Sequence, residues 1–313
     1  MLSDRESLFR HEALFHSGEG EFLAGALPFV REAVAGDEPV LIAVGESKLR
    51  LLEAHLGHGA HGIRRADIRQ VARNPARIIP LWGEFVADHS VAGRPVRGIA
   101  EPVWPGRSEA ELVECRHTEL LLNVAFADAP SWRLLCCYDA DALDPEVLEA
   151  AQRTHPVIAE DGINRQSDAY LPPPEAPGPF DAPLPEPSPV PDELAFSASD
   201  LGKVRGLAYR QAMNAELEAA RTSSLVLAVN ELATNSVRHA GGRGTLRVWH
   251  EPDALVCEVR DHGHFDSPLV GRERPEPLLL EGRGLWLVNQ VCDLVQIRSS
   301  ASGTVVRVRM DLG

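Results

Sequence analysis

A proline-rich segment divides this chain into two parts. Leu171 to Asp192 reads LPPPEAPGPFDAPLPEPSPVPD and contains ten prolines. Because proline lacks a backbone N–H and fixes its own φ, this composition predicts an extended spacer with little packing of its own. Such a segment can also be a ligand for a partner domain, but a spacer is the simpler interpretation. We therefore expect two domains, residues 1–165 and 193–313, joined by a linker over 166–192.

Composition and charge narrow the class of protein. With 313 residues, of which 44% are hydrophobic, the chain can bury two ordinary cores. Its net charge of −15 argues against direct nucleic-acid or anionic-membrane binding, because phosphate contacts need clustered cations. The longest apolar runs, LLLNVAFA and SLVLAV, are far shorter than the roughly 20 residues that span a bilayer. The N-terminus does not resemble a signal peptide, so we expect a cytoplasmic protein with no membrane partner.

The cysteine count and placement predict reduced thiols. There are five, an odd number, and four of them lie in apolar stretches, so we expect buried thiols without disulfides. No CxxC pair occurs, and a structural zinc site is therefore not expected.

Apolar strands alternate with helical patterns before the proline-rich segment. The expected strands lie at 39–45, 96–104 and 131–140, and the expected helices at 46–57, 75–93 and 108–127. This alternation predicts a mainly parallel sheet covered by helices on both faces, a three-layer α/β/α domain.

Two motifs in this half have weak support. GHGAHG, at residues 57–62, has the GxGxxG spacing but follows a predicted helix, which is the wrong context for a dinucleotide site. His55, His58 and His61 repeat every three residues, yet the two glycines between them interrupt the helical face that a metal site would need. We expect neither site.

Polar side chains gather near the predicted strand ends, where open parallel sheets bind ligands. Solvated faces and satisfied core polar groups are the alternative. The candidates are Glu101, Trp104, Arg116, His117, Glu119, Tyr138, Asp139 and His155. Four of their segments, EPVW, ECRHTEL, CCYD and THP, lie between about Phe9 and Ile158 and together resemble the MEDS sensory domain of bacterial regulators. The resemblance implies a sensor whose ligand is unknown.

The last third of the chain carries four motifs in order. NELATNSVRHA places Glu231 and Asn235 four residues apart on a predicted helix, so a carboxylate and an amide oxygen can share one metal–phosphate centre. Asp261 ends a predicted strand in DHGHF and can accept a hydrogen bond from an adenine amine. Gly282 and Gly284 precede an apolar helix, whose N-terminus can bind phosphate.

The fourth motif is SGTVV, in which Thr304 opens a final strand. Taken singly, a Glu/Asn pair at this spacing is more often a solvated helix face, a strand that ends in Asp and Gly is more often a turn, and a GxG before a helix is a weak signal. Their fixed order within one domain-sized stretch favours a nucleotide site.

Residues from about Ala195 to Gly313 resemble the GHKL ATPase superfamily, most closely its anti-sigma-factor serine kinase branch. The resemblance implies a Bergerat-type α/β sandwich that binds ATP and Mg²⁺. It assigns Glu231 as catalytic base and Asn235 as the magnesium ligand. The nucleotide contacts that it implies are Asn235, Asp261, Gly263, Gly282, Gly284, Leu285 and Thr304.

The chain departs from the family pattern at one motif. Where the superfamily often has a last glycine in DxGxG, this sequence has Phe265, and the lid that follows, residues 267–281, is short and contains proline. Arg238 and His239 follow on the same helix. They are candidates for phosphate contacts, with a cationic helix end as the alternative.

The two resemblances together imply a regulator that acts by partner switching. The kinase domain would bind a sigma factor and phosphorylate a serine or threonine of its STAS-domain antagonist; proteins of this branch also commonly form homodimers. The alternative is a nucleotide-binding scaffold that transfers no phosphate. A histidine autokinase would need a phosphoacceptor on a helical hairpin, and the nearest candidate, His11, lacks that context. A small-molecule enzyme has little support, since no GxSxG or GxxxxGK[ST] motif occurs.

Overall fold

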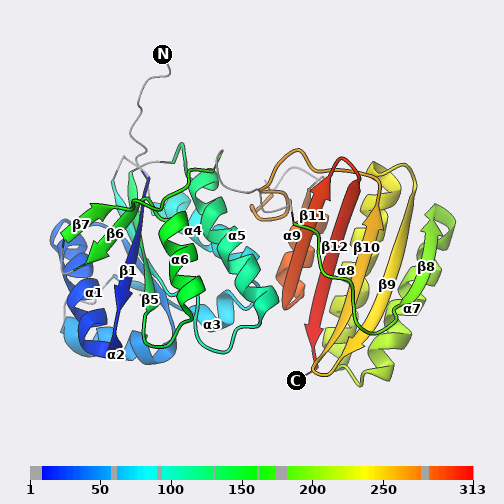
Figure 1. Ribbon diagram of the computed structural model, residues 1–313, viewed down its shortest axis with the longest axis horizontal. Coiled ribbons are helices and arrows are strands. Elements are labelled where there is room, and N and C mark those ends of the chain that lie inside the picture. Colours follow the sequence, from blue (N-terminus) through cyan, green and yellow to red (C-terminus); the bar gives the residue numbers. More distant parts are fainter. Residues whose placement is uncertain are drawn as a thin grey trace, which may run out of the picture. The chain divides into compact units, whose positions relative to one another are not determined.

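The computed structural model describes residues 9–57, 62–89, 94–129, 131–160, 163–173, 182–275 and 282–312. The chain separates into two compact units, Met1–Ala176 and Pro177–Gly313 (Figure 1). The inner four residues of GHGAHG, with His58 and His61, lie outside the described residues, and so do residues 276–281 of the expected lid.

The first unit is built on one seven-stranded sheet with the order β3-β2-β4-β5-β1-β6-β7. Neighbouring strands are parallel except for the antiparallel pair of β6 and β7 at one edge. The strands are β1 (Phe9–His16), β2 (Val40–Val44), β3 (Arg64–Asp67), β4 (Val96–Ala100), β5 (Trp132–Asp139), β6 (Val157–Glu160) and β7 (Ile163–Gln166).

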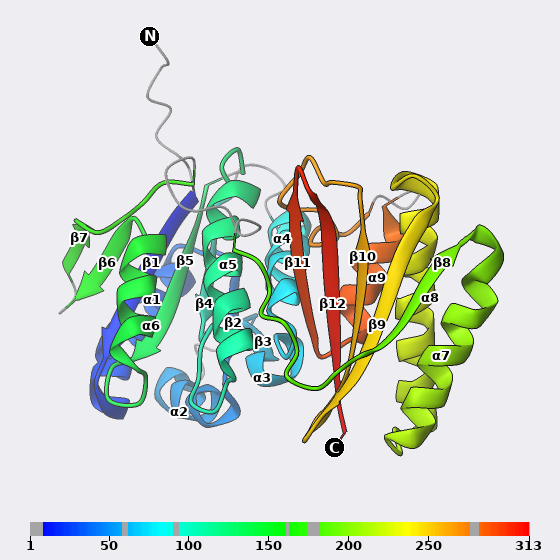
Figure 2. The ribbon, with the colours of Figure 1, turned by 45° about the vertical axis from the view of Figure 1, so that its right-hand side comes forward.

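Helices cover both faces of this sheet (Figure 2). They are α1 (Gly18–Ala35), α2 (Glu46–Leu56), α3 (Ile68–Val71), α4 (Ile78–His89), α5 (Glu109–Ala125) and α6 (Pro145–Thr154), with a 3₁₀ turn at Pro75–Arg77. Phe22 of α1 and Leu52 of α2 pack with Cys137 on one face. On the other face the Trp82 ring of α4 lies 5.9 Å from the Trp132 ring of β5. The predicted three-layer α/β/α architecture with a mainly parallel sheet is confirmed.

The second unit contains a five-stranded sheet with the order β11-β12-β10-β9-β8. Every neighbouring pair in it is antiparallel. The strands are β8 (Asp192–Ser197), β9 (Arg243–Glu251), β10 (Ala254–Asp261), β11 (Leu294–Ser300) and β12 (Gly303–Asp311).

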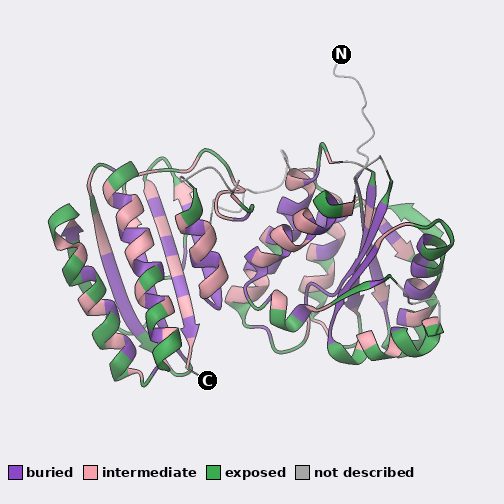
Figure 3. Ribbon diagram, turned by 180° about the vertical axis from the view of Figure 1, so that it is seen from behind, coloured by how far each residue is buried: buried purple, intermediate pink, exposed green. Residues whose placement is uncertain are grey.

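Three helices pack on one face of this second sheet (Figure 3). They are α7 (Leu201–Asn214), α8 (Ala219–His239) and α9 (Arg283–Val291), preceded by a 3₁₀ turn at Ala198–Asp200. Leu225, Val229 and Leu232 form a buried stripe on α8 at helical spacing. Alternate residues of β10, such as Leu255 and Cys257, meet that stripe. The two-layer α/β sandwich expected for a GHKL domain is confirmed.

The opposite face of the second sheet carries a charged network. Glu258 of β10 is completely buried, and its carboxylate receives hydrogen bonds from three arginines, Arg247 at 2.9 Å, Arg260 at 2.6 Å and Arg307 at 2.7 Å. Because an unpaired buried carboxylate would be costly, this convergence of cations is what allows a charge to lie in the middle of the sheet.

The end of the proline-rich segment crosses this charged face. Arg298 donates to the carbonyl of Ala182 at 2.9 Å, and Arg307 donates to the carbonyl of Pro185 at 2.8 Å. Glu186 accepts hydrogen bonds from Arg247 and Arg260, which hold its pKa at about 2. Residues 182–186 are thus bound to the second unit, unlike the weakly packed spacer that the composition predicts.

All five cysteines are free and buried, as expected. Among the described residues, no helix combines the length and apolar character needed to cross a membrane.

Candidate functional site

Helix α8 places Glu231 and Asn235 beside each other. The buried stripe of this helix includes Leu232 and Ser236, and the two polar residues lie on its half-buried flank. Their spacing of four residues stacks them one turn apart, so both side chains leave the helix in the same direction.

The first turn of α9 packs against these two side chains. A Cβ atom at Gly284 would lie 3.0 Å from Glu231 Oε2 and 3.3 Å from Asn235 Nδ2, so only a glycine fits here without a shift. Gly282, the N-cap, has the left-handed φ of 81° that starts the helix. A carboxylate, an amide and a helix N-terminus therefore meet at one point, which suits an anionic ligand with a bound cation.

Asp261 lies at the other end of the site, where β10 ends. Its Oδ2 accepts a hydrogen bond from Ser236 at 2.5 Å, and its Oδ1 accepts one from the Gly263 N–H at 2.9 Å. These bonds fix the carboxylate, while each oxygen keeps a lone pair for an exocyclic amine. Ser236 was not predicted from the sequence, because a serine inside a helix has many roles.

A chain of hydroxyl groups ties Thr304 to the same loop. Asp261 and Thr304 are paired across β10 and β12. Thr304 Oγ1 donates to the Gly263 carbonyl at 2.9 Å and lies 3.0 Å from Ser299 Oγ, which in turn accepts from the Phe265 N–H at 2.9 Å. These bonds hold the DHGHF loop in place.

Gly303 allows the two strands to approach each other next to Asp261. Its φ is 132°, and a Cβ atom there would lie 2.2 Å from the Asp261 carbonyl oxygen. We expect Gly303→Ala to lower the free energy of unfolding by at least about 1–3 kcal/mol, measured by urea denaturation. Gly242→Ala is the control, because its φ of 81° is also positive but the space around it is open. Equal losses in the two variants would contradict the close approach.

One cavity of about 320 Å³ joins these groups. Seven of the eight residues predicted for the site line it, and Glu231 approaches it through its contact with Gly284. The predicted lining residues are Asn235, Asp261, Gly263, Gly282, Gly284, Leu285 and Thr304. The sequence did not indicate Ala240 or Val270, which add apolar surface; Phe265, at the departure from the family motif, also lines the cavity, and so does His239. Arg238 is exposed and does not line it.

The candidates of the first unit fall into separate groups. Glu101 accepts hydrogen bonds from the Gly45 N–H and from Lys48 Nζ, both at 2.8 Å. The Trp104 ring stacks under Arg107, and Asp139 caps the turn at Asp141. Arg116 is exposed, and His117 lies 3.6 Å from Glu114.

Glu119, Tyr138 and His155 come together in the interior. Tyr138 donates to Glu119 at 3.1 Å, and His155 Nε2 lies 3.1 Å from the same carboxylate. The sequence did not indicate that His11 and Cys136 join them. Burial, reinforced by His155, lowers the pKa of His11 to about 4, so its imidazole is neutral at pH 7. Because His11 is fully buried in a sheet, it also cannot act as the exposed phosphoacceptor of a histidine kinase.

The fold and the cavity of the second unit define a nucleotide-binding domain of the ATPase kind. Residues 194–310 match the family described as histidine kinase-like ATPase domain, and residues 10–156 match MEDS, the methanogen/methylotroph, DcmR sensory domain. This chain therefore joins an N-terminal MEDS domain to a C-terminal histidine kinase-like ATPase domain. The second domain implies ATP as a ligand.

Solved structures resemble parts of the chain at low identity. The nucleotide-free catalytic domain of histidine kinase ThkA is 13% identical over 39% of this chain and 96% of its own, with a TM-score of 0.27. The RsbU and RsbW domains of Rv1364c from Mycobacterium tuberculosis are 17% identical over 67% of this chain and 49% of their own, with a TM-score of 0.30. Acinetobacter baumannii histidine kinase AdeS is 13% identical over 39% of this chain and 68% of its own, with a TM-score of 0.25. These scores are too low for a functional comparison, and no curated protein matches the chain significantly.

Proposed function

We propose that this protein is an ATP-dependent protein serine/threonine kinase that regulates transcription by partner switching. The second domain would bind a sigma factor and phosphorylate its STAS-domain antagonist, under control of a signal received by the MEDS domain. The observation that carries the proposal is the meeting of Glu231 and Asn235 with Gly284, at the N-terminus of α9, in a cavity that extends to Asp261. Because sigma factors act with RNA polymerase, the proposal also places the protein in the cytoplasm.

The site offers a group for each part of a magnesium nucleotide. Asn235, together with the nucleotide phosphates, would hold Mg²⁺, an ion that prefers oxygen ligands and neutralises phosphate charge. The N–H groups of Gly284 and Leu285 would bind the phosphates. Asp261 would accept the adenine amine, with Gly263 and Thr304 beside it.

Phosphate transfer requires positioning and charge neutralisation more than covalent chemistry. The serine oxygen would attack the γ-phosphorus, the bond from that phosphorus to the β,γ-bridging oxygen would break, and ADP would leave. Glu231 would accept the hydroxyl proton of the incoming serine. Its position against Gly284 supports this role, because the carboxylate then lies next to the phosphate-binding turn.

The proposal can be tested with γ-³²P-labelled ATP, Mg²⁺ and the STAS proteins of the same organism. We expect label on a serine or threonine of one STAS protein, and release of sigma factor from its complex should depend on that label. If no STAS protein is labelled while ATP and sigma factor both bind, the kinase proposal is wrong.

Asn235→Ala should weaken Mg²⁺-dependent ATP binding by about 10- to 100-fold, since it removes the amide oxygen proposed to contact the ion. Isothermal titration of the full-length protein with and without Mg²⁺ measures this loss. Asn230→Ala is a matched control, because Asn230 lies on the same helix and contacts Arg205 outside the cavity. Undiminished metal-dependent affinity in Asn235→Ala would contradict the assigned role.

A nucleotide-binding scaffold without phosphate transfer is the second candidate. It is favoured by Phe265, which takes the place of a motif glycine and lines the cavity together with Val270. Apolar bulk beside the nucleotide could restrict closure over it. In that case Mg·ATP would change the affinity for sigma factor in the wild type, and the non-hydrolysable analogue would have the same effect.

A further inference from the structure

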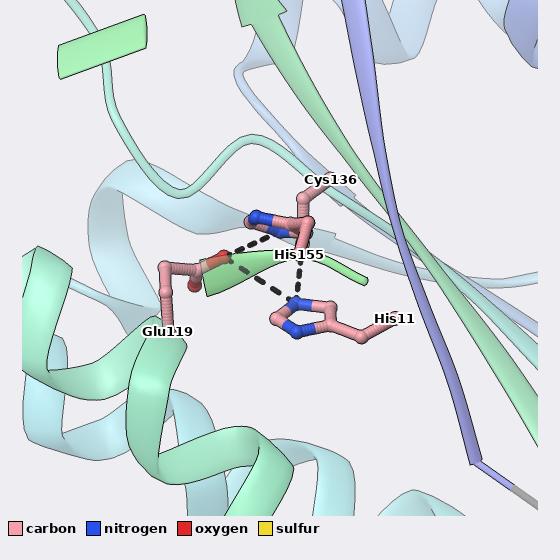
Figure 4. Close-up of side chains that lie close together, drawn as sticks. All are labelled: His11, Glu119, Cys136 and His155. Carbon is pink, nitrogen blue, oxygen red and sulfur yellow. Dashed lines mark hydrogen bonds and ion pairs between the residues drawn. The ribbon is translucent and has the colours of Figure 1, made fainter. Parts of the chain in front are cut away.

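Four ligating side chains meet in the interior of the MEDS domain (Figure 4). His11 comes from β1, Cys136 from the adjacent β5 and Glu119 from α5, while His155 directly follows α6. Glu119 is 3% exposed and the other three are completely inaccessible to solvent. Helices α5 and α6 thus hold two of these side chains against two that project from the sheet.

The spacing of the four ligating atoms is that of a metal centre. His155 Nε2 and Glu119 Oε2 are 3.1 Å apart, His11 Nε2 and Glu119 Oε2 are 3.5 Å apart, and Cys136 Sγ is 3.4 Å from His11 Nε2. Tetrahedral zinc with bonds of about 2.0–2.3 Å would place its ligands about 3.3–3.6 Å from one another. All four atoms lie within 4.8 Å of one another, so small side-chain shifts would close the set.

The proton positions leave the Nε2 lone pair of His155 directed at the centre. His155 Nδ1 lies 2.7 Å from the Ala151 carbonyl oxygen, which can only accept, so the ring proton is on Nδ1. His155 Nε2 is thus the nitrogen that faces Glu119, and in the neutral ring it carries the lone pair. It is a buried nitrogen without a hydrogen-bond partner.

His11 is held in the same tautomer by Asn123. The Asn123 amide donates to the carbonyls of Glu119 at 3.3 Å and Thr154 at 2.8 Å, which uses both of its protons and fixes its orientation. Asn123 Oδ1 must then accept from His11 Nδ1, at 3.2 Å. The two imidazoles are thus oriented as metal-binding histidines are, with Nδ1–H bonded to an oxygen and Nε2 facing the cluster, where His11 Nε2 can accept a hydrogen bond from the Cys136 thiol.

In the described part of the chain, no arginine or lysine forms an ion pair with the Glu119 carboxylate. Glu119 receives a hydrogen bond from Tyr138, but among the described residues its only ion-pair partners are the two histidines. The Cys136 thiol can donate its proton to His11 Nε2, so the lone pair that faces the Glu119 carboxylate is that of His155 Nε2. A positive charge between these two groups would relieve their repulsion in the dry interior.

We propose that His11, Glu119, Cys136 and His155 bind one divalent transition-metal ion, and that the ion is Zn²⁺. Two imidazole nitrogens, one sulfur and one carboxylate oxygen form a donor set that suits zinc, whereas Mg²⁺ and Ca²⁺ prefer oxygen ligands. Access is provided by a cavity of about 150 Å³, which both Glu119 and Tyr138 line. With four protein ligands the centre is closed, which is typical of a metal that stabilises a fold.

The test uses full-length protein without a histidine tag, stripped with a chelator and reloaded with Zn²⁺ or Co²⁺. Elemental analysis after gel filtration should give one zinc per chain. The Co²⁺ form should show a thiolate-to-cobalt charge-transfer band, and zinc X-ray absorption should fit one sulfur with two imidazoles. These measurements on the wild type need no variant, so they decide the matter even if a substitution prevents folding.

Cys136→Ala should abolish the charge-transfer band, and His155→Ala should weaken zinc binding by at least about 100-fold, more than the loss of an outer-shell partner does. Cys137→Ala is the matched control, since Cys137 is the next residue on β5, equally buried but on the opposite face of the sheet. It should retain the band and the zinc. A wild type that holds no stoichiometric zinc, or a band that survives in Cys136→Ala, would overturn the proposal.

Discussion

Replacing Glu231 with glutamine should slow phosphate transfer by about 10²- to 10⁴-fold and leave ATP affinity nearly unchanged. Glutamine has the shape of glutamate and can keep the contact with Gly284, but it cannot accept the proton of the incoming hydroxyl. Single-turnover labelling of the STAS protein measures the rate, and titration with Mg·ATP measures the affinity.

Glu218→Gln is the control for this experiment. Glu218 precedes the first turn of the same helix, is exposed and makes no capping hydrogen bond, so its replacement removes the same charge far from the cavity. It should transfer phosphate at the wild-type rate. If Glu231→Gln transferred phosphate as fast as Glu218→Gln, another group would accept the proton, and the assignment of Glu231 as the base would be wrong.

Replacing Glu258 with alanine should destabilise the ATPase domain by about 3–5 kcal/mol, the usual effect of removing one partner from a buried ion pair. The variant would leave Arg247, Arg260 and Arg307 facing one another around an empty position. Thermal and urea unfolding of the full-length protein, followed with and without nucleotide to identify the transition of the ATPase domain, measures the loss.

Glu193→Ala is the control that separates the effect of burial from the effect of charge on stability. Glu193 also pairs with Arg247, but at 3.9 Å and with its side chain 62% exposed, so its removal should cost less than about 1 kcal/mol. If Glu258→Ala also cost less than about 1 kcal/mol, the three arginines would have found other partners, and the buried carboxylate would not be needed for the stability of the domain.

The sequence predicted the second domain better than the first. Glu231, Asn235 and Asp261 lie in short motifs whose local structure fixes where their side chains point. Asn235 and Asp261 line one cavity, and Glu231 lies next to it beside Gly284. Ser236 and Ser299 could not be predicted, because their roles depend on which carboxylate or strand faces them, and that is set by tertiary packing.

The proposed zinc ligands of the first domain illustrate the opposite case. Its ligands come from two strands, a helix and the residue after another helix, between His11 and His155, so no spacing rule connects them. The absence of CxxC argued against zinc, but that rule covers only ligands carried by a short loop. Strand β1 and helix α1 were also not predicted from the sequence. His11 and Cys136 lie on neighbouring strands because β1 is placed between β5 and β6 in the sheet.

The anchoring of residues 182–186 determines where force on the interdomain chain would act. A pull on this segment would first load Arg298 of the edge strand β11, which holds Ala182. It would then load Arg247, Arg260 and Arg307, which belong to the three central strands of the ATPase sheet. Arg260 immediately precedes Asp261, and the strand of Arg307 begins beside Thr304. Mechanical strain on the segment would therefore reach the Asp261 and Thr304 end of the cavity along strands β10 and β12.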